Sequence, residues 1–192
     1  DVAAIRQFYT DRGFFDVRVA GKVVVSPDSK EVMVQFLVDE GPRYIVDKVT
    51  FRGATAVTEE QLRKELRLVE GCVYDADLVK RDTREIVRAY SPYGYIHVAR
   101  DPNPDPNYLR IDEQRIFQRE PGKVELVYNI HEGKPFQLGR IIVKGNSKTQ
   151  DKVVLREMRG VTPGELYNSS NVARSQDRIR GTRPLASTAD RA

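Results

Sequence analysis

The chain repeats one stretch of its own sequence, and this repeat limits what it can fold into more than any other feature. The segment EGPRYIVDKVTFRGA begins at Glu40 and the similar segment EGKPFQLGRIIVKGN begins at Glu132, so the offset is 132 − 40 = 92. Apolar positions coincide at this offset, as Phe51 does with Val143. The chain is therefore predicted to contain copies of one small structural unit.

A second match lies upstream of the first. The segment IRQFYTDRGFFDVRV from Ile5 aligns with IVRAYSPYGYIHVAR from Ile86, at an offset of 86 − 5 = 81. The two offsets differ by 92 − 81 = 11 residues, which we interpret as an insertion in the second copy. We place it in the stretch DPNPDPNYLRIDEQRIFQREPGK, because its prolines and asparagines are typical of a loop.

The matches divide the chain into one whole unit flanked by two partial ones. Residues 1–42 match the C-terminal half of the unit, residues 43–134 form a complete unit, and residues 135–181 match the N-terminal half. The tail 182–192 reads TRPLASTADRA, matches neither a helix ending nor a strand, and is expected to be disordered.

The complete unit begins with a strand and a helix. Ile45, Val49 and Phe51 alternate with polar residues, which predicts a strand with one buried face. Thr58 is a favourable N-cap and Gln61 completes a capping box, which predicts that the first helix begins there.

A second helix and two further strands follow. Asp75 is a favourable N-cap for the helix, and SPYG ends it because Pro92 cannot continue a helix. Strands are predicted at residues 95–100 and 124–130, the last with strict alternation of apolar and polar residues. The unit is therefore β-α-α-β-β, with the last two strands as an antiparallel hairpin. We predict an α+β fold in which two helices pack on one face of a three-stranded mixed sheet.

Composition excludes several classes of protein. The 32 Lys and Arg and the 28 Asp and Glu give a net charge of +4, and the two signs are interspersed, which favours a solvated surface over a nucleic-acid patch. The only cysteine, Cys72, excludes an internal disulfide. No nucleophile elbow, phosphate loop or paired-carboxylate pattern is present, so no catalytic residues, cofactor or enzyme activity are expected.

Two candidate metal patterns fall short of a site. The stretch DPNPDPN places oxygen ligands at alternate positions, but a calcium loop needs Gly at its sixth and Glu at its twelfth position. Pro106 and Asp112 stand there, which favours a stiff loop. His97 and His131 have no ligand at metal spacing, so no metal site is expected.

These residues resemble a known family. The β-α-α-β-β order, the helix ending YTDRGFFDV, and the segments EGPRYIVDKVTFRG and EGKPFQLGRIIVKGN are similar to POTRA domains of Omp85-superfamily outer-membrane protein assembly factors. The glycines typical of the family are Gly41, Gly53, Gly94, Gly133 and Gly145. The tail departs from the pattern, because Arg183 and Ser187 stand where a tyrosine and a glycine should recur.

The resemblance implies a site as well as a fold. In POTRA sheets of order 1-3-2 the second strand is an edge, and an extended client segment can pair with it by β-augmentation. On this basis the residues expected to receive a client are Phe14, Phe15, Asp16, Val17, Arg18 and Val19 in the first copy and Tyr95, Ile96, His97, Val98, Ala99 and Arg100 in the second.

The resemblance also implies location and partners. We expect a periplasmic part of an outer-membrane protein that binds unfolded outer-membrane proteins and accessory assembly subunits. Contact with the membrane is expected only through a barrel that this sequence does not contain, and no nucleic acid is expected as a partner. The two complementary halves at the ends of the chain also predict domain-swapped self-association.

Other functions remain open from the residues alone. Two-partner secretion and division proteins also carry POTRA-like modules. A KH-like nucleic-acid-binding module has a similar β-α-α-β order, but it clamps the backbone with a GXXG loop between its helices. The corresponding turn here is VEGCVYD, with one glycine.

Overall fold

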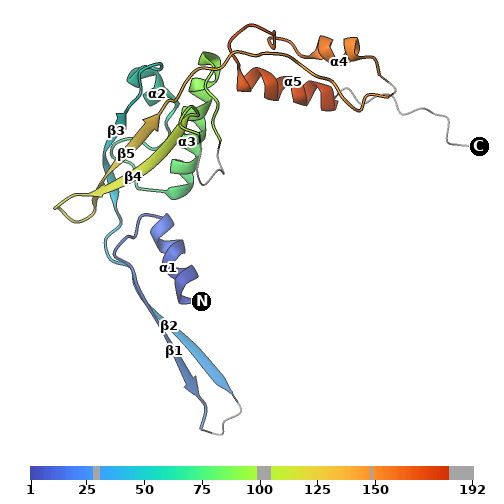
Figure 1. Cartoon of the computed structure of the whole chain (residues 1–192). Coiled ribbons are helices and arrows are strands. Elements are labelled where there is room, and N and C mark those ends of the chain that lie inside the picture. The colour runs from blue at the N-terminus through green and yellow to red at the C-terminus, as the bar shows by residue number, and fades with distance from the viewer. Residues whose placement is uncertain (28–30, 99–104, 148, 182–192) are drawn as a thin grey trace, which may run out of the picture. The chain divides into compact units, whose positions relative to one another are not determined.

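The computed structural model describes residues 1–27, 31–98, 105–147 and 149–181 (Figure 1). The chain forms two compact units, one made of residues 1–54, 59–86 and 111–130 and the other of residues 55–58, 87–110 and the chain from 131 onward. The elements in chain order are α1 (Val2–Asp11), β1 (Arg18–Val25), β2 (Val32–Asp39), β3 (Ile45–Arg52), α2 (Glu59–Glu65), α3 (Ala76–Tyr90), the 3₁₀ helix η1 (Ser91–Tyr93), β4 (Arg110–Phe117), β5 (Lys123–His131), α4 (Asp151–Glu157) and α5 (Ser169–Gly181).

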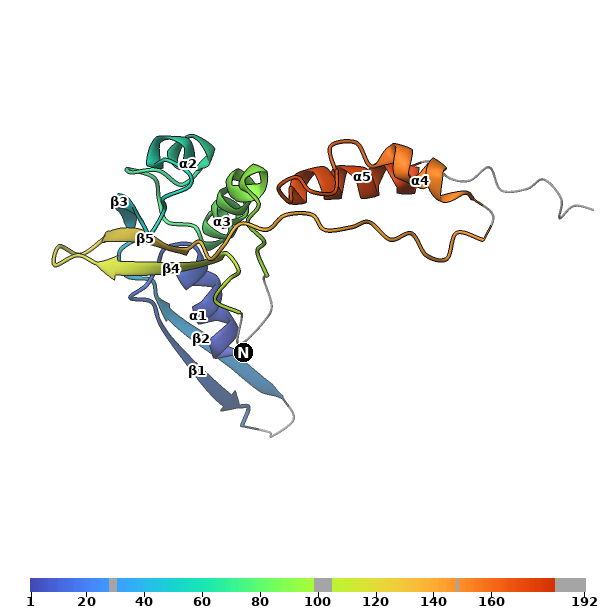
Figure 2. The same ribbon diagram turned by 45° about the horizontal axis from the view of Figure 1, so that its top comes forward.

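The first unit contains a three-stranded mixed sheet of order β3-β5-β4. Strands β3 and β5 are parallel, with Val49 opposite Leu126. Strands β4 and β5 are joined by residues 118–122, a connection short enough only for an antiparallel hairpin. Figure 2 shows α2 and α3 on one side of this sheet. The predicted α+β arrangement of two helices on a three-stranded mixed sheet is confirmed.

The core forms where α2 and α3 cover the central strand. Val124, Leu126 and Tyr128 alternate along β5 and are all 0% exposed. Leu62 from α2 and Ile86 from α3 are also fully buried. A strand that is flanked by strands on both sides and covered by helices keeps its inward side chains from water, so β5 supplies the largest share of the core.

A buried carboxylate fixes the connection between α2 and α3. Asp82 in α3 is 0% exposed, and its two carboxylate oxygens accept hydrogen bonds from the backbone amides of Arg67 and Leu68 at 2.9 and 2.8 Å. These amides follow the end of α2 and would otherwise be buried without acceptors. The sequence analysis did not single out Asp82.

The first copy, α1 with the antiparallel hairpin β1–β2, lacks a counterpart of β3 among the described residues. Strand β1 corresponds to β4 at the offset 110 − 18 = 92, and β2 corresponds to β5 at the same offset. No third strand pairs with β2 in the described sheet. Its residues Val32, Val34 and Phe36 are therefore 62%, 56% and 42% exposed, although their counterparts in β5 are fully buried.

The last copy has the complementary form. It contains α4 and α5, but the segment that corresponds to β3 forms only one isolated bridge, between Gln137 and Leu166. Ile141, the counterpart of Val49, is half-buried, whereas Val49 is 0% exposed. The backbone of Leu138 is bonded on one side, where its amide donates to the Glu165 carbonyl at 2.8 Å and its carbonyl accepts the Gly164 amide at 2.7 Å. No described strand pairs with this segment on its other side, so a longer ladder does not form.

Hydrogen bonds repeat at the two junctions between copies. The amide of Tyr44 donates to the Gly13 carbonyl at 2.8 Å, and the amide of Tyr74 donates to the Tyr44 carbonyl at 3.0 Å. The same two bonds recur one copy later. The Phe136 amide donates to the Gly94 carbonyl and the Tyr167 amide donates to the Phe136 carbonyl, both at 2.8 Å. The junctions are thus built alike, within the first unit and within the second.

The position predicted for the second strand of the complete copy, residues 95–100, is wrong. Residues 95–98 contain a single bridge, His97 to Leu109, and residues 99 and 100 lie outside the described residues. The second strand is β4, inside the stretch that we expected to be a loop. The insertion precedes this strand, so that Leu109 and Ile111 take the buried positions that Val17 and Val19 hold in the first copy.

Aromatic packing explains why residues after each helix were mistaken for strands. Phe14 packs edge-on against Tyr9 with ring centroids 5.7 Å apart, and Tyr95 packs edge-on against Tyr90 at 5.4 Å. The aromatic residue that follows the turn glycine thus folds back onto its own helix. Strand β1 accordingly begins at Arg18 and not at Phe14.

A carboxylate closes the turn after β5. Glu132 accepts hydrogen bonds from the Thr55 amide at 2.6 Å, the Ala56 amide at 2.8 Å and the Tyr90 hydroxyl at 2.8 Å. The Thr55 hydroxyl also donates to it. Glu132 thereby ties the loop after β3 to the end of α3.

We expect this carboxylate to make stability depend on pH. Burial acts to raise the pKa of Glu132, but the hydrogen bonds from Thr55, Ala56 and Tyr90 outweigh it, so the pKa lies below its usual value. The unfolded chain then binds more protons near pH 4 than the folded chain does. The free energy of unfolding should therefore fall as the pH drops through about 4.3 toward the folded pKa.

Chemical denaturation at several pH values would measure this slope. Glu132→Gln should lower stability at pH 7 and flatten the slope, because amide hydrogen bonds are weaker than those of a carboxylate. Glu120→Gln, at an exposed carboxylate that pairs with Lys123, should change neither. An unchanged slope in Glu132→Gln would contradict the assignment.

Two equivalent glycines test how closely β3 approaches β5. Gly53 has φ of +84°, and a Cβ there would lie 2.3 Å from the Ile130 carbonyl oxygen. Gly145 has φ of +83° and nothing within 4 Å of that position. Gly145→Ala should cost about 1 kcal/mol from the left-handed backbone alone. Gly53→Ala should cost about 3 kcal/mol or more, because the strands must separate. Thermal or chemical unfolding would compare them, and equal losses would contradict the prediction.

Candidate strand-docking edges

The outer edge of β3 is closed by its own chain. The amide of Val46 donates to the Cys72 carbonyl at 2.8 Å, and the amide of Gly71 donates to the Val46 carbonyl at 2.8 Å. A further bridge joins Ile45 to Val73. The loop between α2 and α3 thus occupies the position at which another strand would have to pair.

Side chains close the same edge further along. Glu70 accepts the Val49 amide at 3.2 Å, and Arg63 donates to the Val49 carbonyl at 2.6 Å. The same two side chains pair with each other at 3.2 Å. The Val49 amide and the Arg63 guanidinium together hold the pKa of Glu70 below its usual value, against the effect of desolvation.

The outer edge of β4 is paired at its start, where the Leu109 amide donates to the Ile96 carbonyl at 2.8 Å, but no described segment pairs with it along Ile111–Phe117. The amide of Gln118 donates to the Lys123 carbonyl at 3.2 Å. This bond sets the register of the β4–β5 hairpin. Since backbone groups in an antiparallel ladder alternate between facing the partner and facing away, every second residue of β4 points outward. The outward residues are Ile111, Glu113, Arg115 and Phe117.

Apolar, charged and aromatic side chains all lie along this edge of β4. Ile111 is buried beneath the helices, whereas Glu113 is exposed. At the far end Phe117 packs edge-on against Phe15 with ring centroids 5.0 Å apart, and the Arg115 guanidinium lies 5.5 Å from the Phe15 centroid. An incoming strand would meet charge in the middle and aromatic rings at the end.

The outer edge of β1 is open in the same way but apolar. The amide of Ser26 donates to the Glu31 carbonyl at 3.0 Å, which sets the register of the β1–β2 hairpin. Backbone groups of every second residue of β1 therefore face away from β2. The residues whose backbone groups face outward are Val19, Gly21, Val23 and Val25. This edge carries no charged side chain at its outward positions.

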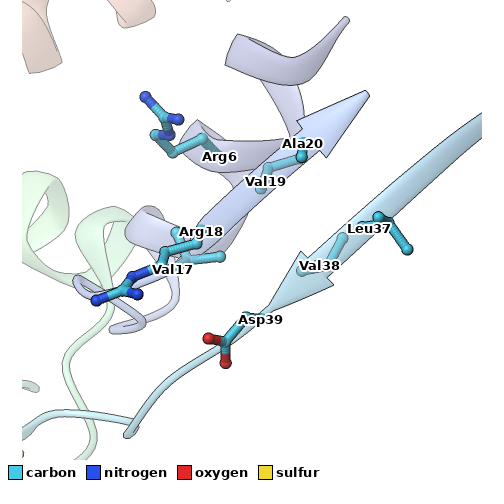
Figure 3. Close-up of a pocket in the computed structure, with 8 residues that line it drawn as sticks. All are labelled: Arg6, Val17, Arg18, Val19, Ala20, Leu37, Val38 and Asp39. Carbon is cyan, nitrogen blue, oxygen red and sulfur yellow. The ribbon is translucent and has the colours of Figure 1, made fainter. Parts of the chain in front are cut away.

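A groove lies at the base of this hairpin, where α1 meets β1 and β2. It encloses about 370 Å³. Figure 3 shows the eight residues that line it, which are Arg6, Val17, Arg18, Val19, Ala20, Leu37, Val38 and Asp39. Valines, an alanine and a leucine form most of the lining, with two arginines and an aspartate beside them, so the groove suits an apolar side chain of an extended segment.

The structure separates the residues predicted for the first edge. Val17, Arg18 and Val19 line the groove. Phe15 instead contacts Tyr44 and Tyr74 with ring centroids 5.2 and 4.9 Å apart. Asp16 accepts the Tyr44 hydroxyl at 3.0 Å, and Phe14 packs on its own helix. Of the six residues, only Val17, Arg18 and Val19 therefore line the groove, and the side chains of Val17 and Val19 are only 7% and 8% exposed.

The residues predicted for the second edge lie at the start of β4. The Ile96 carbonyl accepts the Leu109 amide at 2.8 Å, and the His97 ring lies 3.0 Å from the Leu109 carbonyl oxygen. Val98 is 36% exposed, and Ala99 and Arg100 lie outside the described residues. Tyr95 packs against Tyr90.

Residues of β4 were missed as candidates, although the sequence holds a signal for them. Arg110 corresponds to Arg18 at the offset 110 − 18 = 92, the offset of the strand that follows the hairpin turn. Extending that offset backward through the proline-rich stretch would have identified Ile111 and Phe117 as strand residues.

Neither a membrane-spanning helix nor a metal-binding cluster occurs in the described parts of the chain. None of the helices that the structure describes is both long and apolar enough to cross a membrane. The described residues contain no cluster of three or more His, Cys, Asp or Glu side chains that could hold a metal ion.

Comparison with known proteins decides the family. The model of the POTRA family, described as surface antigen variable number repeat, matches residues 44–133 and 136–182. The chain belongs to the POTRA family. Of the relatives with known roles, outer membrane protein assembly factor BamA of Nitratidesulfovibrio vulgaris is 30% identical over 188 residues, which cover 95% of this chain and 22% of that protein.

A second relative and a solved structure agree with this POTRA assignment. BamA of Neisseria meningitidis is 28% identical over 181 residues, 93% of this chain and 21% of that protein. The crystal structure of Haemophilus influenzae BamA POTRA3-5 superposes with a TM-score of 0.60 at 17% identity, covering 94% of this chain and 67% of that one. The POTRA segment spans about a fifth of the length of the curated relatives it matches.

Hydrogen exchange would test the open edge of this POTRA sheet. From the alternation set by the bond between Gln118 and Lys123, the amides of Glu113 and Arg115 should point outward, whereas those of Gln114 and Ile116 should face β5. We expect the two outward amides to exchange at least about tenfold faster, as measured by NMR in deuterated buffer. Equal protection of all four amides would mean that another segment covers this edge.

Proposed function

We propose that this POTRA segment belongs to a scaffold that receives unfolded outer-membrane β-barrel proteins by strand augmentation and docks accessory subunits. The observation that carries the proposal is a contrast between strand edges. The outer edge of β3 is closed by the residues around Cys72, whereas no described segment pairs with the outer edge of β1 or with that of β4 beyond Leu109. The names of the relatives, outer membrane protein assembly factors, support the same role. The proposed scaffold acts by binding and carries out no catalysis.

Backbone pairing explains how one surface accepts many clients. An extended segment aligned beside β4 would exchange hydrogen bonds with the outward backbone groups of Ile111, Glu113, Arg115 and Phe117. Every client offers the same backbone donors and acceptors, so pairing itself demands no particular sequence. The side chains next to the edge then adjust the affinity.

The two open edges favour different client side chains. Strand β4 presents Glu113 and Arg115, so it favours a segment with charges of both signs. Strand β1 presents Val23 and Val25 and lies beside the apolar groove that Val17 and Val19 line, so it favours an apolar segment. In the first copy the proposed client contact thus keeps Val17, Arg18 and Val19 of the residues expected from the sequence.

A titration observed by backbone NMR separates this proposal from the alternatives. An extended peptide from a membrane β-strand should shift the amides of β4 or β1, with little dependence on salt. A short single-stranded RNA should shift none, whereas a KH-like module would respond to RNA near the turn around Gly71, with a steep salt dependence. Shifts with neither ligand would favour a module that only docks other folded subunits, as a secretion or division protein could use.

A proline on β4 sharpens the test. Glu113→Pro removes an amide that faces the client but none that faces β5, so the sheet should survive and peptide affinity should fall at least about tenfold. Glu113→Thr keeps the amide, removes the charge and should bind nearly as well as the unchanged chain. Circular dichroism checks that both variants fold. Equal affinity of the two variants would contradict augmentation at β4.

A further inference from the structure

We propose that a groove between α2 and α3 of the complete copy binds an acidic side chain of a partner protein. The groove encloses about 380 Å³ and is lined by Lys64, Glu65, Leu66, Arg67, Arg81 and Glu85. These residues come from α2, from the turn after it and from α3, all inside the complete copy. The partner would be one of the accessory subunits of the proposed function, on which this inference rests.

The three cations of the groove have no ion-pair partner among the residues that the structure describes. Lys64, Arg67 and Arg81 are exposed, and their charged groups form no hydrogen bond with any described residue. Arg63, one residue before Lys64, instead pairs with Glu70 at 3.2 Å. The cations of the groove are therefore available to a negative group from outside the chain.

A buried carboxylate holds the backbone of both arginines in place. Asp82 is 0% exposed and accepts the Arg67 amide at 2.9 Å, and Arg81 directly precedes Asp82 in α3. The turn that carries Arg67 is thus tied to the helix that carries Arg81 before any ligand arrives. A site whose backbone is already fixed loses less conformational freedom on binding.

Cations recur in the last copy at the positions of the groove. The counterparts of Lys64, Arg67 and Arg81 are Arg156, Arg159 and Arg174, at an offset of 92 before the turn between the two helices and 93 after it. None of the other cations of α2 and α3 has a cationic counterpart. Their equivalents in the last copy are Leu155, Ala173, Asp177 and Gly181. The recurrence thus follows the groove and not the helix surfaces as a whole.

The last copy places a side chain of its own at the equivalent position. Arg178 corresponds to Glu85 at the offset of 93. Its guanidinium donates to the Glu157 and Arg159 carbonyls at 2.9 and 3.4 Å. It also donates to the Ser175 hydroxyl at 2.8 Å. The complete copy has Glu85 at that position and an open groove, so it has room for a polar side chain that its own chain does not supply.

The charges of the groove favour a carboxylate over a phosphate. Arginine presents a planar fork of donors that fits a carboxylate with two parallel hydrogen bonds. Glu65 and Glu85 line the groove beside the cations. They would repel a phosphate group with about two negative charges, or a membrane surface with many, more than a single carboxylate. Leu66, which is 8% exposed, offers an apolar contact to the methylene groups of an aspartate or glutamate.

A short acidic peptide would probe the groove in the full chain. The probe is a capped, alanine-rich helical peptide with two glutamates one turn apart, and its control carries glutamines instead. NMR should show saturable shifts of the side-chain Nε–Hε signals of Arg67 and Arg81, with a dissociation constant of about 1 mM at low salt. The glutamine peptide should shift neither signal.

Variants separate the groove from general charge. Arg67→Gln and Arg81→Gln should each weaken binding of the glutamate peptide at least about fivefold. The fold should persist, as circular dichroism can check, because Asp82 binds the backbone amide of Arg67 and not its side chain. Arg84→Gln removes the same charge from α3 outside the groove and should change the affinity by less than about twofold. Arg81→Lys keeps the charge but loses the fork, so its affinity should lie between these two cases.

Equal binding of the glutamate and glutamine peptides, or equal losses in Arg81→Gln and Arg84→Gln, would overturn the proposal. Tighter binding of inorganic phosphate or of phosphatidylglycerol vesicles than of the glutamate peptide would also overturn it, in favour of a phosphate or a lipid surface. Client binding at β4 is tested separately. Arg81→Gln should leave the membrane-strand peptide bound at β4, and Glu113→Pro should leave the glutamate peptide bound in the groove, so each proposal can fail without the other.

Discussion

The parallel pairing of β3 with β5 is the interaction on which the complete copy depends. It joins segments far apart in the chain, as the hydrogen bond of 2.7 Å between Thr50 and Glu125 across 75 residues illustrates. Once β3 is in place, β5 becomes a central strand and its inward side chains leave water. Where the same pairing is missing, in β2 and in the segment around Ile141, the same apolar pattern remains partly or wholly exposed.

The pairing also decides which edge of the sheet can receive another strand. An open edge is a liability in most proteins, because unpaired backbone groups invite aggregation. Here the outer edge of β3 is closed by the loop around Cys72 and by the side chains of Arg63 and Glu70. In β4, by contrast, no described segment pairs with the outer edge beyond Leu109. The closed edge of β3 would direct the proposed strand augmentation to β4.

Sequence reasoning found the repeat, the fold class and the N-cap of α3, because these depend on neighbouring residues and on periodicity. Asp75, for example, accepts the Asp77 amide at 2.8 Å as its position before the helix predicted. The position of the second strand was not predicted correctly. An insertion shifts strand residues without changing their local pattern, and Tyr95 resembles a strand residue although it packs on Tyr90.

The sequence by itself determined that this chain is built from copies of one β-α-α-β-β unit, since a pattern repeated at a fixed offset can have few other origins. It also determined the turn glycines Gly53 and Gly94, which have positive φ, and the cap Asp75. Only the tertiary structure decided which strand lies at an edge, which edge is closed, and that Asp82 and Glu132 hold the loops. These features depend on backbone groups brought together from distant parts of the chain, and local sequence carries no record of such contacts.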